Sequence, residues 1–142
     1  MSPAAAIIFL VGRVLFGALF ASSARGHIMN GDRYTAVARR ARLPFPEVAG
    51  WPIAVWLVAG DLSIILGIWP DIGALMLAAF LLPTTLLFHA FWTFSDPSER
   101  RTQISSFARN VSLLGGCLIM FAALVTLGHS LRFIIAGPAL SF

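Results

Sequence analysis

The feature that most constrains this chain is a series of four apolar stretches, each of about 20 residues. They run over residues 4–24, 51–70, 72–94 and 104–127. At a rise of about 1.5 Å per residue, helices of this length match the hydrocarbon core of a bilayer, which is about 30 Å thick. The sequence therefore predicts an all-α fold, a four-helix transmembrane bundle that forms one domain over residues 1–142.

The composition excludes most soluble alternatives. Hydrophobic residues make up 58% of the chain and charged residues 11%, and the mean hydropathy is +0.87. Soluble domains carry about 25% charged residues, so we expect neither a soluble enzyme nor a free nucleic-acid-binding domain. Cys117 is the only cysteine, which excludes an intrachain disulfide and an iron–sulfur ligand set.

The arginines predict an orientation. The connections over residues 25–50 and 95–103 together hold seven arginines, whereas Arg13 and Arg132 are assigned to the opposite side. By the positive-inside rule, the Arg-rich connections are cytoplasmic and both termini lie outside.

The first connection also contains a predicted amphipathic helix. Asn30 or Asp32 is a suitable N-cap, and Pro44 stops the helix after about Arg42. One face is largely apolar and the others carry arginine, which is typical of a helix at the membrane surface that meets anionic headgroups. The alternative is a docking site for a soluble partner. The residues of the apolar face are Tyr34, Val37, Ala38 and Ala41.

Two charged residues lie near the middle of their spans. Arg13 is in the first span and Asp61 in the second. Since antiparallel helices joined by a loop place their midpoints at one depth, we expect a midplane ion pair with a two-pronged hydrogen bond. Buried charges in a membrane are costly and tend to be paired. Two hypotheses stay open: the pair fixes the register of two helices, or it forms a proton-relay or ligand site.

A second polar cluster is expected nearer the cytoplasmic side. His89 and Arg109 lie at similar depth in the third and fourth spans, and His27 follows the first span on the same side. Such a pocket would accept a flat quinone or another lipid-like ligand. The alternative is an interfacial aromatic belt, with Arg109 extending to the headgroups. The full predicted pocket comprises His27, His89, Trp92, Gln103, Arg109 and Asn110.

Several motifs resemble the DoxX family of small bacterial four-helix membrane proteins. The most specific are Phe88-His89-Ala90-Phe91-Trp92 and the block from Gln103 through Phe107-Ala108-Arg109-Asn110 to Gly115-Gly116. Weaker matches are Arg13 to Gly17, Gly26-His27 and Leu43 to Pro46. Two positions depart from the family pattern: Arg109 stands where Lys is usual, and Leu57 stands where a Glu is frequent, one turn before Asp61.

The resemblance implies a fold and a location in membrane electron-transfer complexes, but it does not imply a reaction. Relatives occur in a terminal quinol oxidase, in thiosulfate:quinone oxidoreductases and in membrane complexes linked to redox stress. We therefore expect a multi-pass protein of the bacterial cytoplasmic (inner) membrane, a non-catalytic accessory or assembly subunit of a larger electron-transfer complex.

The expected partners are membrane lipids and other membrane subunits, not nucleic acid. No metal site and no covalently bound cofactor is expected, and no catalytic residue is assigned. The alternative is a quinone- or lipid-binding component of a membrane oxidoreductase. A small transporter that uses Arg13 and Asp61 is the third hypothesis, which no inverted repeat supports.

Overall fold

A computed structural model of the chain describes residues 1–140. The regular elements are all helical. Their order is α1 (Pro3–Met29), α2 (Gly31–Arg40), the 3₁₀ helix η1 (Pro46–Ala49), α3 (Trp51–Leu66), α4 (Pro70–Pro83), the π-helix η2 (Thr84–Phe88), the 3₁₀ helix η3 (Phe91–Thr93), α5 (Pro97–Leu127) and the 3₁₀ helix η4 (Gly128–Ser130).

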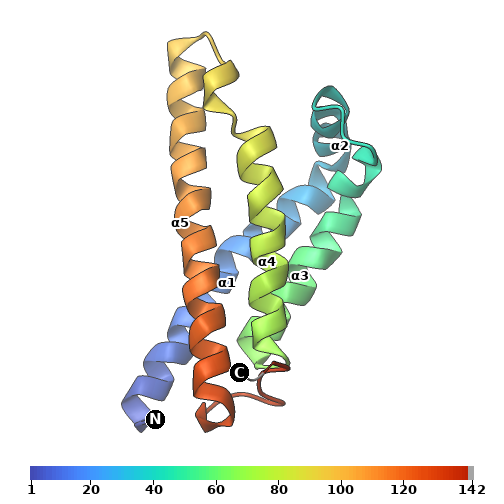
Figure 1. Ribbon diagram of the computed structural model, residues 1–142. Helices are drawn as coiled ribbons and strands as arrows, with labels where there is room; N and C mark the ends of the chain where they lie inside the picture. The colour runs from blue at the N-terminus through green and yellow to red at the C-terminus, as the bar shows by residue number, and fades with distance from the viewer. Residues whose placement is uncertain (141–142) are drawn as a thin grey trace.

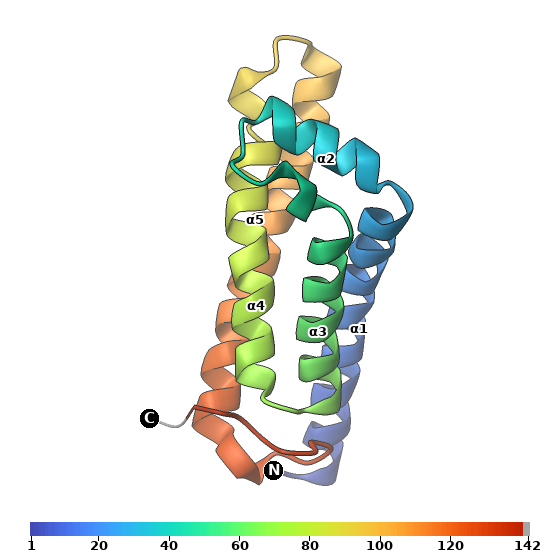
Figure 2. The same cartoon turned by 90° about the vertical axis from the view of Figure 1, so that its right-hand side faces the viewer.

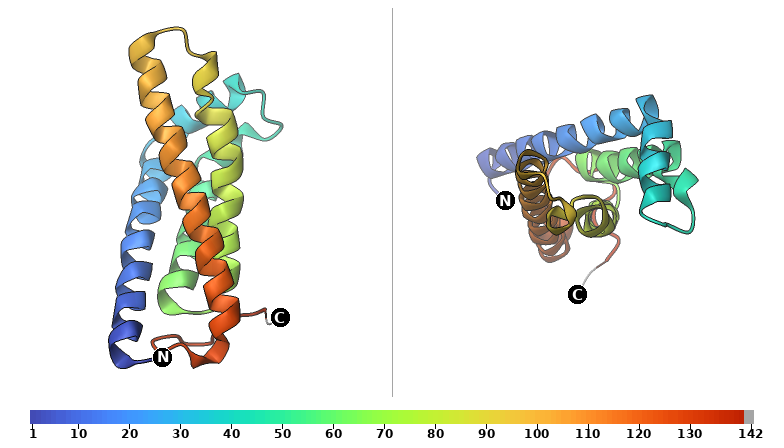
Figure 3. Two further views of the ribbon diagram at one scale, coloured as in Figure 1. Left: turned by 60° about the vertical axis from the view of Figure 1, so that its left-hand side comes forward. Right: turned by 90° about the horizontal axis from the view of Figure 1, so that it is seen from above.

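The four long helices form the bundle that the sequence predicted. α1 packs on α3, α3 on α4, and α4 on α5. The first residues of the chain and the described residues that follow η4 lie at one end of the bundle, here called the terminal end. α2 and the connection between α4 and α5 lie at the other end (Figures 1 and 2). The view from above shows that α1 runs obliquely across the bundle (Figure 3).

Three segments are long and apolar enough to cross a membrane, namely Pro3–Met29, Pro70–Thr93 and Pro97–Leu127. α3 is shorter, with 16 residues, or about 24 Å of helix. It ends four residues before the predicted limit of its span because Gly67 adopts a left-handed conformation (φ +69°), and its N–H bonds to the carbonyl of Ser63 at 3.0 Å. This is the usual C-terminal glycine signal of a helix.

Two glycines let α3 and α4 approach closely. A Cβ on Gly73 would lie 2.6 Å from the carbonyl oxygen of Gly60 and 2.6 Å from the hydroxyl of Ser63. Small residues at such crossings allow backbones to touch, and van der Waals packing then holds the helices together within a membrane. The central core lies around this crossing and includes Leu57, Ile64, Ala74, Leu77 and Leu81.

The α-helix of the third predicted span ends at the middle of that span, at Pro83. Pro83 has no N–H to continue the helical ladder, and the backbone widens into the π-helix η2 directly afterwards. The hydroxyls of Thr84 and Thr85 donate to the carbonyls one turn back, those of Phe80 and Leu81, at 2.7 and 2.6 Å. The chain then leaves the helical path, which places His89 at a bend rather than on a straight helix.

α2 confirms the helix predicted in the first connection. Its residue Ala38 is fully buried, and Arg39 pairs with Glu47 of η1 at 2.9 Å. The hydrogen bond and charge of Arg39 hold the pKa of the Glu47 carboxyl below its usual value. α2 is thereby tied to the segment that leads into α3.

Candidate functional site

Arg13 lies inside the bundle toward the terminal end. Its side chain is 1% exposed. Nη1 donates to the carbonyl of Ile64 in α3 at 3.2 Å, and Nη2 donates to the carbonyl of Phe133 at 2.6 Å. The guanidinium group therefore connects α1, α3 and the segment that follows η4.

Asp61 lies on the same α1–α3 interface and is 5% exposed. It packs on Gly17, where an added Cβ would overlap its carboxylate. Since Arg13 precedes Gly17 by one turn and Ile64 follows Asp61 by nearly one turn, the two charges are offset by about 5 Å along the interface. The ion pair expected from the sequence is not formed, because Arg13 is directed to backbone carbonyls. Among the side chains that the structure describes, the only ion pair joins Arg39 to Glu47.

A third buried charge was missed by the sequence analysis. Asp71, in the first turn of α4, is fully buried. Its two carboxylate oxygens accept hydrogen bonds from the backbone N–H groups of Ala139 and Leu140, each at 2.8 Å. An aspartate in the first turn of a helix ordinarily interacts favourably with the helix dipole. The residues around Asp71 in the sequence did not indicate that its partner lies 68 residues away.

Residues 131–140, here called the C-terminal segment, close the terminal end of the bundle (Figure 2). The N–H of Ile135 bonds to the carbonyl of Leu66 at 3.2 Å, and the N–H of Trp69 bonds to the carbonyl of Gly137 at 3.1 Å. Together with the bonds from Arg13 and to Asp71, these contacts hold the segment beneath the α3–α4 turn.

At the opposite end, part of the predicted pocket is assembled. Nδ1 of His89 donates to Oε1 of Gln103 on α5 at 2.8 Å. The Trp92 ring stands edge-on to Phe91 and Phe107, with centroid distances of 5.1 and 6.0 Å. Such edge-to-face packing suits aromatic quadrupoles. The structure thus brings His89 and Gln103 together beside an aromatic cluster that includes Trp92.

Asp96 fixes the start of α5 near this cluster. Its carboxylate accepts from the hydroxyl of Ser98 at 2.5 Å and from the N–H groups of Ser98 and Glu99 at 3.0 and 2.9 Å. These hydrogen bonds lower the pKa of the Asp96 carboxyl. The cap sets where α5 begins and so contributes to the position of Gln103.

His27 belongs to a different contact set. Its Nδ1 donates to the carbonyl of Ala49 at 2.6 Å, and its ring stacks on Tyr34 of α2 with centroids 4.0 Å apart. An edge contact to Phe80 of α4 completes the set, with centroids 5.8 Å apart. His27 thus docks α2 and η1 on the bundle.

The last two residues of the predicted pocket, Arg109 and Asn110, lie on different sides of α5. Arg109 is exposed, whereas the neighbouring Asn110 is buried. They occupy different sides of the helix because consecutive residues are rotated by about 100°. Asn110 shares the side of Phe107, from which it is separated by three residues, and Arg109 points outward.

A family model described as DoxX matches residues 8–90, which is more than half of the chain. The protein belongs to the DoxX family. Comparisons with curated proteins and with solved structures give no match. In this DoxX protein the matched range contains Arg13, Asp61, Asp71 and His89, while Gln103, Trp92, Arg109 and Asn110 lie beyond it.

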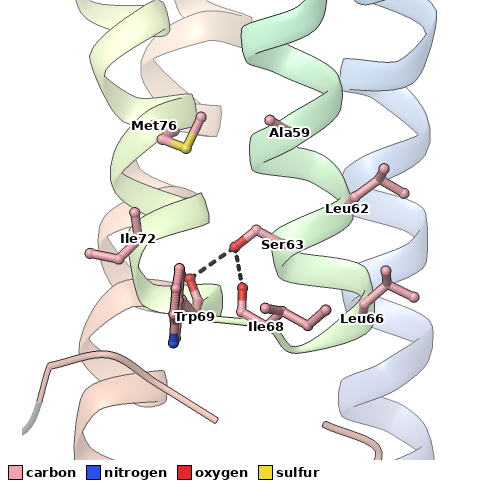
Figure 4. Close-up of a pocket in the computed structure, with 8 residues that line it drawn as sticks. All are labelled: Ala59, Leu62, Ser63, Leu66, Ile68, Trp69, Ile72 and Met76. Atoms are coloured by element: carbon pink, nitrogen blue, oxygen red, sulfur yellow. Dashed lines mark hydrogen bonds between the residues drawn. The ribbon is translucent and has the colours of Figure 1, made fainter. Parts of the chain in front are cut away.

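Two apolar grooves of the DoxX protein lie away from all the predicted site residues. One, of about 310 Å³, runs between α3 and α4 and is drawn in Figure 4. Its single polar side chain, Ser63, donates to the carbonyls of Ile68 and Trp69 at 2.7 and 2.8 Å. The second, of about 500 Å³, continues along α3 to Trp51 and Ile28. Ala59 and Leu62 line both, so the grooves form one continuous surface, here called the α3 groove.

Among the residues that the structure describes, no group of three His, Cys, Asp or Glu side chains is placed to hold a metal ion. Cys117 is a buried free thiol in the core. The buried polar groups of this DoxX protein instead bond largely to its own backbone: Arg13 to Ile64 and Phe133, His27 to Ala49, and Asp71 to Ala139 and Leu140.

Proposed function

We propose that this DoxX protein is a non-catalytic accessory or assembly subunit of a larger electron-transfer complex in the bacterial cytoplasmic membrane. The observation that carries the proposal is the α3 groove. It follows α3 over most of its length, and the serine that lines it is already hydrogen-bonded within the protein. A membrane helix of a partner subunit is the occupant that fits this shape and chemistry.

Small side chains favour a helix as the occupant. Ala54 and Ala59 line the α3 groove, and small residues let two membrane helices pack closely. The exposed tryptophans Trp51 and Trp69 lie near the two ends of α3, as expected where a helix meets the two membrane surfaces. The α3 groove therefore has the lining expected of a helix-binding surface.

The orientation follows from the charges. The connections that hold α2 and the start of α5 carry seven arginines, so we place that end in the cytoplasm and the terminal end outside. A reporter enzyme active only in the cytoplasm, fused after Leu140, is expected to be inactive. Activity there would reverse the assignment.

The subunit proposal is tested by photo-crosslinking in native membranes. A photoreactive amino acid at Ala59 is expected to crosslink to one membrane protein, which should also co-migrate with this protein on native gels after mild extraction. The matched control is Ile119, an exposed residue of α5 that lies outside the groove. Equal crosslinking at both positions, or migration as a lone monomer, would contradict the proposal.

A second candidate function is binding of a quinone or similar lipid at the cytoplasmic end. The hydrogen bond between His89 and Gln103, next to the rings of Phe91, Trp92 and Phe107, favours it. Since Nδ1 donates to Gln103, Nε2 is left as an acceptor. Quinone binding measured by quenching of the protein's tryptophan fluorescence should be lost when His89→Ala and Gln103→Ala are combined. Binding that survives the double substitution would remove this candidate.

A further inference from the structure

Two orphaned polar atoms lie in the interior of the bundle. Among the described side chains, Nε of Arg13 and Oδ1 of Asp61 are the two buried atoms that have no hydrogen-bond partner in the protein. Leaving such atoms unpaired costs about 1–3 kcal/mol each, and more for charged groups. Their location on one helix–helix interface indicates a shared partner.

Both atoms lie at the interface between α1 and α3. Arg13 and Gly17 lie on one face of α1, and Asp61 and Ile64 lie on the facing side of α3. The absent side chain of Gly17 leaves room for the Asp61 carboxylate against α1. Arg13 reaches Ile64 with Nη1, whereas the Asp61 carboxylate lies against Gly17, one helical turn further along α1. The Nε atom of Arg13 lies on the α1 side of its guanidinium group.

The two atoms have opposite requirements. Nε–H of Arg13 donates and needs an acceptor, whereas Oδ1 of an ionised Asp61 accepts and needs a donor. A metal cation satisfies only the carboxylate, and an anion satisfies only the guanidinium. A water molecule accepts from the first and donates to the second, and buried waters commonly make about three such bonds.

We propose that Arg13 and Asp61 form a binding site for water inside the membrane, which the C-terminal segment separates from the outside. The site is distinct from the α3 groove, and the inference does not depend on the subunit proposal. The second hydrogen bond of the guanidinium group, from Nη2 to Phe133, is made to the segment itself. Asp71 holds that segment in place through Ala139 and Leu140.

The site gives the protein an exchangeable proton at membrane depth. The water and the N–H protons of Arg13 exchange with the external solution only when the C-terminal segment moves. The exchange rate of the Arg13 Nε proton therefore reports on how firmly the segment is held.

The test is water-edited solid-state NMR on the whole protein in lipid nanodiscs, with uniform ¹⁵N labelling. Magnetisation is transferred from water to side chains, and the Nε signal of Arg13 is assigned by its loss in Arg13→Lys or by sequential assignment. We expect clear transfer to Nε of Arg13, and none to the backbone amide of Leu57, a residue that is fully buried one turn before Asp61. Arg39, which is exposed, is the positive control. Absence of transfer to Arg13 would overturn the proposal.

Two variants at Asp61 add a matched comparison. Asp61→Asn keeps an acceptor for the water and should retain the transfer, whereas Asp61→Leu should reduce it several-fold. If Asp61→Leu does not fold, the transfer measured in the wild-type protein and in Asp61→Asn still tests whether water is bound at the site. Loss of the transfer in a folded Asp61→Asn protein would contradict a bridging water.

A third variant tests the role of the C-terminal segment. Asp71→Asn loosens its hold on Ala139 and Leu140 and should speed hydrogen–deuterium exchange of the Arg13 Nε proton several-fold. An unchanged rate would show that the segment does not control access to the site.

Discussion

Arg13 and Phe133 are joined by a hydrogen bond of 2.6 Å across a sequence separation of 120 residues. The bond runs from a buried guanidinium group of α1 to a backbone carbonyl of the C-terminal segment. Phe133 adopts a left-handed conformation, with φ at 58°, which is unusual for a bulky residue. The bond from Arg13 contributes to holding that conformation.

The first prediction concerns Asp71. Asp71→Asn replaces one of the two accepting oxygens with an amide that cannot accept, so one hydrogen bond to the C-terminal segment is lost. We expect a free energy of unfolding lower by about 1.5–3 kcal/mol, as is typical of a hydrogen bond to a charged group. Denaturation in detergent micelles measures it. Asp32→Asn, at an exposed site on α2, is the control and should change stability little; equal losses in both variants would contradict the assigned role.

The second prediction concerns Gly17. A methyl group there overlaps the carboxylate of Asp61 and the end of Ile65, so Gly17→Ala should destabilise the protein by about 1–3 kcal/mol, as overpacking does. Gly12 lies on the same helix with nothing within 4 Å of an added Cβ. Gly12→Ala should therefore be neutral or slightly stabilising, since alanine favours helix. If both changes had the same effect, helix propensity rather than the contact with Asp61 would explain it.

Much of the fold followed from the sequence because apolar stretches of membrane length admit few structures. The four-helix bundle was predicted correctly in this way, and α2 was predicted from its N-cap candidates and the proline that follows it. The end of α3 was misjudged: Gly67 and Trp69, both with positive φ, turn the chain before the apolar stretch has ended. The length of an apolar stretch reflects how much of the chain lies in lipid, whereas the end of a helix depends on local backbone conformation. The end of the apolar stretch and the end of the helix therefore need not coincide.

The candidate site was less predictable. The positions of Arg13 and Asp61 along their predicted spans correctly indicated that both lie on one helix–helix interface. Those positions could not show which acceptors the guanidinium group reaches. Those acceptors are backbone carbonyls, which every residue carries and no sequence pattern marks. The same holds for Asp71, whose partners are backbone N–H groups. His27 was assigned to the level of His89, yet its actual neighbours Ala49, Tyr34 and Phe80 depend on how the first connection folds back.

The third prediction is a pH dependence at the cytoplasmic end. The pairing with Arg39 lowers the pKa of Glu47, so the stabilisation from this pair is complete above the usual glutamate pKa of about 4.3. It is lost as the pH falls through the lowered value. Arg39→Gln should raise the pKa of Glu47 toward its usual value, measured by carboxyl ¹³C NMR in micelles. Arg40→Gln, at the adjacent residue, should leave the pKa lowered. A Glu47 pKa that does not respond to Arg39→Gln would rule out the pair as its cause.

The fourth prediction concerns His89 and Gln103. Their side chains meet at 2.8 Å, so a double-mutant cycle with His89→Ala and Gln103→Ala should give a coupling energy of about 0.5–1.5 kcal/mol. Unfolding in detergent provides the four stabilities. The matched cycle pairs His89→Ala with Arg109→Ala, an exposed residue on another side of α5, and should be additive within about 0.5 kcal/mol. Coupling to Arg109 as strong as to Gln103 would mean that the pocket closes around all three residues, because additivity fails only where side chains share a contact or a network.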